Sequence, residues 1–209
     1  MNVTSIYKMG RTVEKVNEKK DWKKVIAVTN RNLCIREPFL KRIERLADLG
    51  AHAILLREKD LLENEYEALA GDVLKICRAR GTTCILHSYP EVAEHLSVSA
   101  LHLPLWRWKE IKEQDKTAGF ETLGISVHSV EEAKQAEQLG ATYLIAGHVF
   151  ATDCKKGLPP RGLDFLQSVC QSVSLPVYAI GGIDWEKMDL VMEAGAAGGC
   201  MMSGLMQAP

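Results

Sequence analysis

The sequence predicts an α/β fold, a (β/α)8 barrel, on three observations. Short apolar runs alternate along the 209 residues with longer amphipathic segments. The runs are apolar on both faces, which is typical of parallel strands that helices cover on both sides. Eight such runs can be counted, and eight units favour closure into a barrel. An open, doubly wound sheet is the structural alternative.

The first half of the chain supplies four strands and three helices. Strands are expected where the short apolar runs lie, over residues 25–29, 53–56, 84–87 and 100–103. Helices are expected over the amphipathic segments 38–49, 61–80 and 90–96. Gly50 and Gly81 directly follow the first two helices, and glycine commonly ends a helix.

The second half repeats the same unit more regularly. Strands are expected over residues 123–127, 143–146, 176–180 and 200–202. Helices are expected over residues 129–139, 163–173 and 184–195. Ser129 and Glu132 match a capping box at the start of the first of these helices, and Asp184 is expected to cap the last.

The two ends of the chain depart from a regular barrel. Pro209 follows the eighth strand closely, so the last helix is expected to be missing or replaced by the N-terminal segment. Residues 1–23 form an N-terminal extension that is compatible with a helix over Thr12 to Trp22. Gly198 and Gly199 precede the eighth strand and are expected to weaken it. We expect a single domain over residues 1–209, since this length suits one core.

Composition excludes several functional classes. A net charge of −1 gives no general attraction to nucleic acid or anionic lipid. No apolar run reaches membrane-spanning length and the start lacks a signal-peptide core, so we expect a cytoplasmic protein. The six cysteines show no CxxC pair and no zinc spacing, and we expect reduced structural thiols. Cys154 precedes two lysines, but a packed loop cysteine is favoured over a nucleophile.

A phosphate site is predicted at the carboxyl ends of the last two strands. Gly181 and Gly182 have no Cβ, so backbone N–H groups there can approach phosphate oxygens closely. Ser203 and Gly204 supply a hydroxyl and further N–H donors from the neighbouring unit. The loops after strands seven and eight often hold phosphate in such barrels. The alternative reading is that the two glycines only make a turn.

His128 is the candidate acid–base group. It directly follows the fifth expected strand, and histidine both donates and accepts a proton near neutral pH. The alternative is a histidine tied to backbone groups in a tight turn. His87, His102 and His148 also lie at or near strand ends, but no carboxylates accompany them. We therefore expect no metal site.

Four basic residues are candidates to bind a substrate carboxylate. Arg57 and Lys59 follow the second strand, and Lys155 and Lys156 follow the sixth. Charged residues at strand ends are also often only solvated. A planar guanidinium is the better partner of a carboxylate, which favours Arg57.

These motifs resemble the thiamin phosphate synthase superfamily, and within it the thiazole tautomerases of the TenI type. The resemblance rests on Ser126 to Ser129, Gly147 to Gly157, Arg161-Gly162, Ala179 to Ile183 and Met202 to Gly204. It implies a (β/α)8 barrel and an isomerase of thiamin biosynthesis. That enzyme would aromatise a thiazole carboxylate phosphate by a proton shift at His128, with no metal and no cofactor. The expected partner is this small phosphorylated thiazole, and a homodimer is compatible with the family.

Two alternatives to the tautomerase stay open. The first is the thiamin phosphate synthase, which joins thiazole phosphate to a pyrimidine diphosphate and holds magnesium on aspartates after strands three and four. The corresponding stretches here, residues 85–90 and 101–107, contain no aspartate, whereas Mg²⁺ prefers carboxylate oxygens. The second alternative is a regulatory homologue that has lost its catalytic activity. Direct DNA binding is not expected, since there is no basic stripe.

Overall fold

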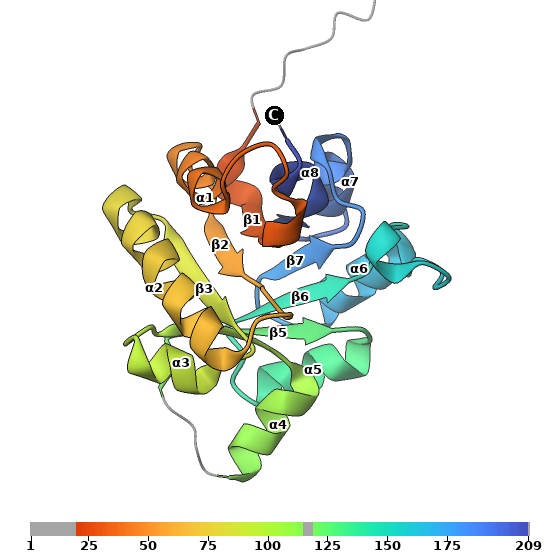
Figure 1. Ribbon diagram of the computed structural model, residues 1–209. Coiled ribbons are helices and arrows are strands. Elements are labelled where there is room, and N and C mark those ends of the chain that lie inside the picture. The colour runs from red at the N-terminus through yellow and green to blue at the C-terminus, as the bar shows by residue number, and fades with distance from the viewer. Residues whose placement is uncertain (1–19, 115–118, 209) are drawn as a thin grey trace, which may run out of the picture.

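The computed structural model describes residues 20–114 and 119–208, and it confirms the predicted barrel. Eight parallel strands follow one another in chain order, and the eighth pairs with the first to close the sheet. Figure 1 shows the helices placed around the outside of these strands, with α7 and α8 returning beside β1. The candidate helix over Thr12 to Trp22 lies mostly outside the described residues.

The strands are short and almost wholly buried. They are β1 (Val25–Val28), β2 (Ala53–Leu56), β3 (Thr83–His87), β4 (Ala100–Pro104), β5 (Thr122–Val127), β6 (Tyr143–Gly147), β7 (Val177–Ile180) and β8 (Gly198–Met201). The helices are α1 (Phe39–Asp48), α2 (Glu63–Arg80), α3 (Pro90–His95), α4 (Leu105–Glu113), α5 (Val130–Gln138), α6 (Gly162–Ser172), α7 (Met188–Glu193) and α8 (Ser203–Met206). Most strand bounds agree with the sequence prediction to within one residue.

Alternation along each strand divides the apolar side chains into two cores. Ile54 and Leu56 of β2 face the helices, in the larger cluster between the sheet and its cover. Ala53 and Leu55 face the barrel interior, in a smaller cluster that includes Tyr143 and Tyr178. Successive strand residues point to opposite faces, so every second residue past a strand end continues toward the barrel mouth. The candidate site is therefore expected among the interior-facing residues at the ends of the strands.

The structure corrects three details of the predicted elements. Helix α4 was not predicted from the sequence. The last helix is not missing, because the short α8 follows β8 and packs near the turn Arg31–Leu33. Gly198 and Gly199 lie inside β8, where a Cβ at Gly198 would stand 2.1 Å from the carbonyl oxygen of Lys24. These glycines permit close packing of β8.

The two helix caps expected from the sequence, Ser129 and Asp184, are present in the structure. The Ser129 hydroxyl accepts a hydrogen bond from the N–H of Glu132, as the capping box predicts. The Glu132 carboxylate, however, reaches the N–H of His128 at 2.6 Å, one residue before the cap. Asp184 caps the turn Trp185–Lys187, which leads into α7. Among the residues described, no helix has the length and apolar character needed to cross a bilayer.

Candidate functional site

A cavity of about 340 Å³ opens at the carboxyl ends of the strands. Most of its wall comes from the interior register of the strands and their continuations. The wall residues from β1 to β5 and the segments that follow them are Val28, Asn30, Leu55, Arg57, Lys59, His87, His102, Pro104, Ser126 and His128. Those from β6 to β8 and their loops are Ile145, Gly147, His148, Thr152, Cys154, Lys155, Ile180, Gly181, Gly182, Ile183, Cys200, Met202 and Ser203.

Three cations gather on one side of this cavity. Arg57 and Lys59 continue the interior register of β2, and Lys155 approaches from the loop after β6. Burial lowers the pKa of Lys59, and the charges of Arg57 and Lys155 lower it further. Burial likewise lowers the pKa of Arg57. No carboxylate of the described residues forms a salt bridge with any of the three, although the charge of the neighbouring Glu58 reaches Arg57. The three cations are therefore available to an anionic ligand.

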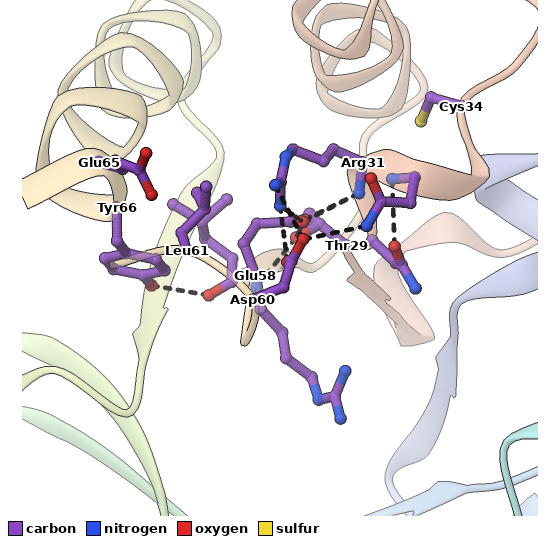
Figure 2. A network of polar contacts seen from close by, with 12 residues as sticks. Thr29, Arg31, Cys34, Glu58, Asp60, Leu61, Glu65 and Tyr66 are labelled. Carbon is purple, nitrogen blue, oxygen red and sulfur yellow. Dashed lines mark hydrogen bonds and ion pairs between the residues drawn. The ribbon is translucent and has the colours of Figure 1, made fainter. Parts of the chain in front are cut away.

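A buried carboxylate between the cations orders the end of β2. Glu58 points away from the cavity and accepts hydrogen bonds from the Thr29 hydroxyl at 2.6 Å and from the backbone N–H of Arg31 at 3.0 and 3.1 Å. The Arg31 guanidinium also contacts Glu58 and bridges it to Asp60 (Figure 2). The Thr29 oxygen in turn accepts the N–H of Arg57 at 2.9 Å. Glu58 therefore positions the backbone that carries Arg57 and Lys59.

His128 lies at the mouth, between β5 and β6. Its Nδ1 lies 2.8 Å from the carbonyl oxygen of Gly147, and a carbonyl only accepts hydrogen bonds. Nδ1 therefore carries a proton, and in the neutral ring Nε2 keeps its lone pair. The ring contact with the Gly147 carbonyl matches the alternative in which His128 is tied to a backbone group, although the His128 side chain also lines the cavity.

The paired glycines after β7 serve the packing of the loop after β6. A Cβ on Gly181 would stand 2.3 Å from the Cβ of His148, and one on Gly182 would stand 2.5 Å from the carbonyl oxygen of Ala151. Both residues have positive φ, at 100° and 66°. Close packing is thus a structural requirement for these glycines, beside any contact that they make with a ligand at the cavity.

Of the remaining predicted site residues, some line the cavity and others do not. Ser203 lines the cavity at the start of α8, but Gly204 is not among the lining residues. Lys155 and Lys156 are both exposed, but only Lys155 lines the cavity, and Lys156 lies 3.7 Å from Asp153. The structure therefore separates two neighbouring lysines that the sequence treated alike.

Three polar residues on strands β3, β4 and β5 line the cavity but were not predicted as site residues. His87 and His102 continue the interior faces of β3 and β4, with their ring centroids 5.7 Å apart. Ser126 of β5 lies two residues before His128 and shares its face. The available signal was the alternation of side chains along a strand, because a residue two positions before a cavity residue faces the same side. Burial lowers the pKa of His102 to about 3, and burial with the charge of His102 lowers the pKa of His87 well below its usual range.

These buried neutral histidines predict a loss of stability in acid. In the unfolded chain their pKa returns to about 6.5, so below that pH the unfolded state binds protons that the folded state does not. The free energy of unfolding then falls by about 1.4 kcal/mol per pH unit for each histidine, down to its folded pKa. Urea unfolding at about pH 7 and about pH 5 should show a drop that is smaller, by about 2 kcal/mol, in His102→Asn. Equal drops in both proteins would contradict this account.

Comparison with known proteins shows the family of this chain. The family model described as thiamine monophosphate synthase matches residues 25–205, from β1 to α8. The chain belongs to this family. Thiamine-phosphate synthase 2 of Streptococcus pneumoniae is 34% identical over 186 residues, which cover 87% of this chain and 86% of the relative. Thiamine-phosphate synthase of Syntrophomonas wolfei is 32% identical and covers 87% of each chain.

A solved member of the thiamine monophosphate synthase family has the same fold. The thiamine phosphate pyrophosphorylase from Pyrococcus furiosus superposes with a TM-score of 0.74 at 31% identity, over 90% of this chain and 89% of that one. The prediction of an isomerase is contradicted, because these relatives are named as synthases, which are transferases. The loop and glycine motifs indicated the superfamily correctly but not the type of reaction. The proton shift assigned to His128 belonged to the isomerase prediction and is withdrawn with it.

Proposed function

We propose that this chain catalyses a thiamine-phosphate synthase reaction on small phosphorylated substrates at the barrel mouth. In this reaction the thiazole ring nitrogen of a thiazole phosphate forms a bond to the methylene carbon of a pyrimidine diphosphate. The bond from that carbon to the diphosphate oxygen breaks, and pyrophosphate leaves with the electron pair. The observation that carries the proposal is the cluster of Arg57, Lys59 and Lys155, none of which forms a salt bridge with a carboxylate of the described residues.

A diphosphate is the group that this cluster suits. It brings several negative charges to a site where burial lowers the pKa of Arg57 and Lys59, and charges attract more strongly where water is partly excluded. Negative charge grows on the leaving pyrophosphate as the carbon–oxygen bond breaks, so the same cations stabilise the transition state. The phosphate of the thiazole would then lie near Gly181, Gly182 and Ser203, at the ends of β7 and β8.

Magnesium, which the synthase reaction uses, does not fit the residues at the ends of β3 and β4. These positions present His87 and His102, both neutral, with Ser88 and Pro104 beside them. Mg²⁺ prefers carboxylate oxygens, and the described chain holds no cluster of three or more side chains suited to a metal ion. We therefore assign neutralisation of the diphosphate to the cationic side chains alone.

The test is direct synthesis. The purified protein is mixed with thiazole phosphate and pyrimidine diphosphate, with magnesium or with a chelator, and thiamine phosphate and pyrophosphate are measured by chromatography. We expect both products in equal amounts, with a rate that the chelator leaves largely intact. Absence of product at high protein concentration would contradict the synthase proposal.

The missing carboxylates favour one second candidate, a homologue that binds the phosphorylated thiazole without turnover. Calorimetry with thiazole phosphate separates the two functions. Binding without product supports the silent homologue, whereas product supports the synthase. If the ligand neither binds nor reacts, both assignments are wrong.

A further inference from the structure

The side chain of Tyr66 joins the ends of two barrel strands. Tyr66 belongs to α2 and is fully buried, and Figure 2 shows its ring pointing from that helix toward the sheet. Its hydroxyl lies 2.7 Å from the carbonyl oxygen of Leu56, the last residue of β2, and 2.8 Å from the backbone nitrogen of His87, the last residue of β3. A helix side chain therefore takes part in the hydrogen bonding of the sheet.

The hydrogen-bond pattern of the strands shows which position this hydroxyl occupies. Along a parallel strand, successive backbone groups point in turn to the two neighbouring strands. The carbonyl of Leu55 accepts a hydrogen bond from the end of β1, so the carbonyl of Leu56 points to β3. The N–H of Ser88 donates to β4, so the N–H of His87 points to β2. Leu56 and His87 thus face each other across the ladder, and the phenol oxygen bonds to both.

Proton counting fixes the direction of both bonds. Burial raises the pKa of Tyr66 above its usual value, so the phenol keeps its proton. A carbonyl only accepts hydrogen bonds and a backbone N–H only donates. The phenol therefore donates to Leu56 and accepts from His87. A phenylalanine at this position could make neither bond.

This bridge lies directly beside the cationic wall. Arg57 follows Leu56 in the chain, and its own N–H donates to the Thr29 hydroxyl from the side of β1. The carbonyl just before Arg57 is held by Tyr66 from the side of β3. Two side chains thus hold the backbone at the end of β2 from its two sides.

A second cavity marks the place where the ends of β2, β3 and β4 diverge. Its volume is about 290 Å³, and it shares Lys59, His87 and Pro104 with the larger cavity. We propose that Tyr66 is a positioning residue. By carrying the last hydrogen bond between β2 and β3, its hydroxyl holds these strand ends apart and directs Arg57 and Lys59 toward an anionic ligand. The assignment of that ligand as a diphosphate rests on the proposed function.

The bridge is measured first, without ligand. Scalar couplings across hydrogen bonds, observed by NMR, detect a direct bond between an amide nitrogen and a carbonyl carbon. We expect this coupling between Thr29 and Leu55, whose N–H and carbonyl oxygen bond directly at 3.0 Å. We expect none between His87 and Leu56, because Tyr66 connects them. A direct coupling between His87 and Leu56 in the unmodified protein overturns the proposal.

Binding of inorganic pyrophosphate, measured by calorimetry, then tests the positioning role. Tyr66→Phe should weaken binding about tenfold, because Arg57 and Lys59 no longer face the anion together. Tyr89→Phe is the matched control, since its ring lies 4.7 Å from that of Tyr66 and its hydroxyl donates to the carbonyl of Leu61 at 2.9 Å. It should bind pyrophosphate as the unmodified protein does. An equal loss in both variants would overturn the proposal, because it would reflect general loosening.

The two measurements separate this inference from the proposed function. If pyrophosphate does not bind even to the unmodified protein, the diphosphate assignment fails, and the NMR coupling still decides whether Tyr66 bridges the strands. If pyrophosphate binds and Tyr66→Phe binds it equally well, the positioning role is wrong while the cationic site stands.

Discussion

Arg57→Ala is expected to lower kcat/KM for thiamine phosphate formation by roughly 10²–10³-fold, the usual cost of removing one preorganised donor to a developing anion. The guanidinium faces the cavity from the end of β2 beside Lys59, and it can hold two phosphate oxygens at once. Arg57→Lys should recover only part of the loss, because an ammonium group lacks the planar pair of donors. Steady-state kinetics with the pyrimidine diphosphate varied measures the effect.

The two neighbouring lysines after β6 provide the control for this prediction. Lys155 lines the cavity and Lys156 does not, although they share a loop and a charge. Lys155→Ala should lower kcat/KM by about tenfold or more, whereas the kcat/KM of Lys156→Ala should stay near that of the unmodified protein. If both lysine variants behave alike, net charge rather than the geometry of the cationic wall determines activity.

Glu58→Gln is expected to destabilise the fold by about 3 kcal/mol, because a buried carboxylate with several donors loses its charge. The new amide group would place N–H donors against the N–H of Arg31 or the hydroxyl of Thr29, which both now donate to Glu58. Urea unfolding measures the change. Activity should fall as well, since the Thr29 hydroxyl that binds Glu58 also holds the backbone of Arg57.

Asp60→Asn is the matched control for the carboxylate change. Asp60 contacts the same Arg31 guanidinium (Figure 2), but its side chain is 51% exposed. Exposed ion pairs contribute little to stability, so the unfolding midpoint should barely move. Equal destabilisation by the two variants would show that the Arg31 ion pairs, and not the buried hydrogen bonds of Glu58, stabilise this corner.

The strands were predictable because each is an apolar run whose residues are buried on both faces. The helices that end at Gly50, Gly81 and Gly140 were predictable for a local reason, since each of these glycines has positive φ directly after its helix. Helix α4 has no such punctuation. Its first residue follows Pro104, which makes no side-chain cap, and Gln114 rather than glycine follows its end.

The site was predictable only in part. Strand-end position selected Arg57, Lys59 and His128 correctly as cavity residues, because an interior residue of a strand is followed by another two positions later. The same rule would have selected Ser126 and His102. It could not distinguish Lys155 from Lys156, whose directions depend on how the loop after β6 folds. Local motifs also did not reveal the reaction type: they predicted an isomerase, whereas the relatives are named as synthases.

The sequence by itself determined the eight strands, most of the helices between them and the presence of cationic residues at strand ends. These properties are local, because they depend on periodicity and on single glycines. Only the tertiary structure decided which charges and hydrogen-bonding groups meet. Closure of the barrel brings Lys155 beside Arg57 and Lys59, and it brings Tyr143 to His102 across Gly124. Such contacts join residues far apart in the chain, so no local pattern records them.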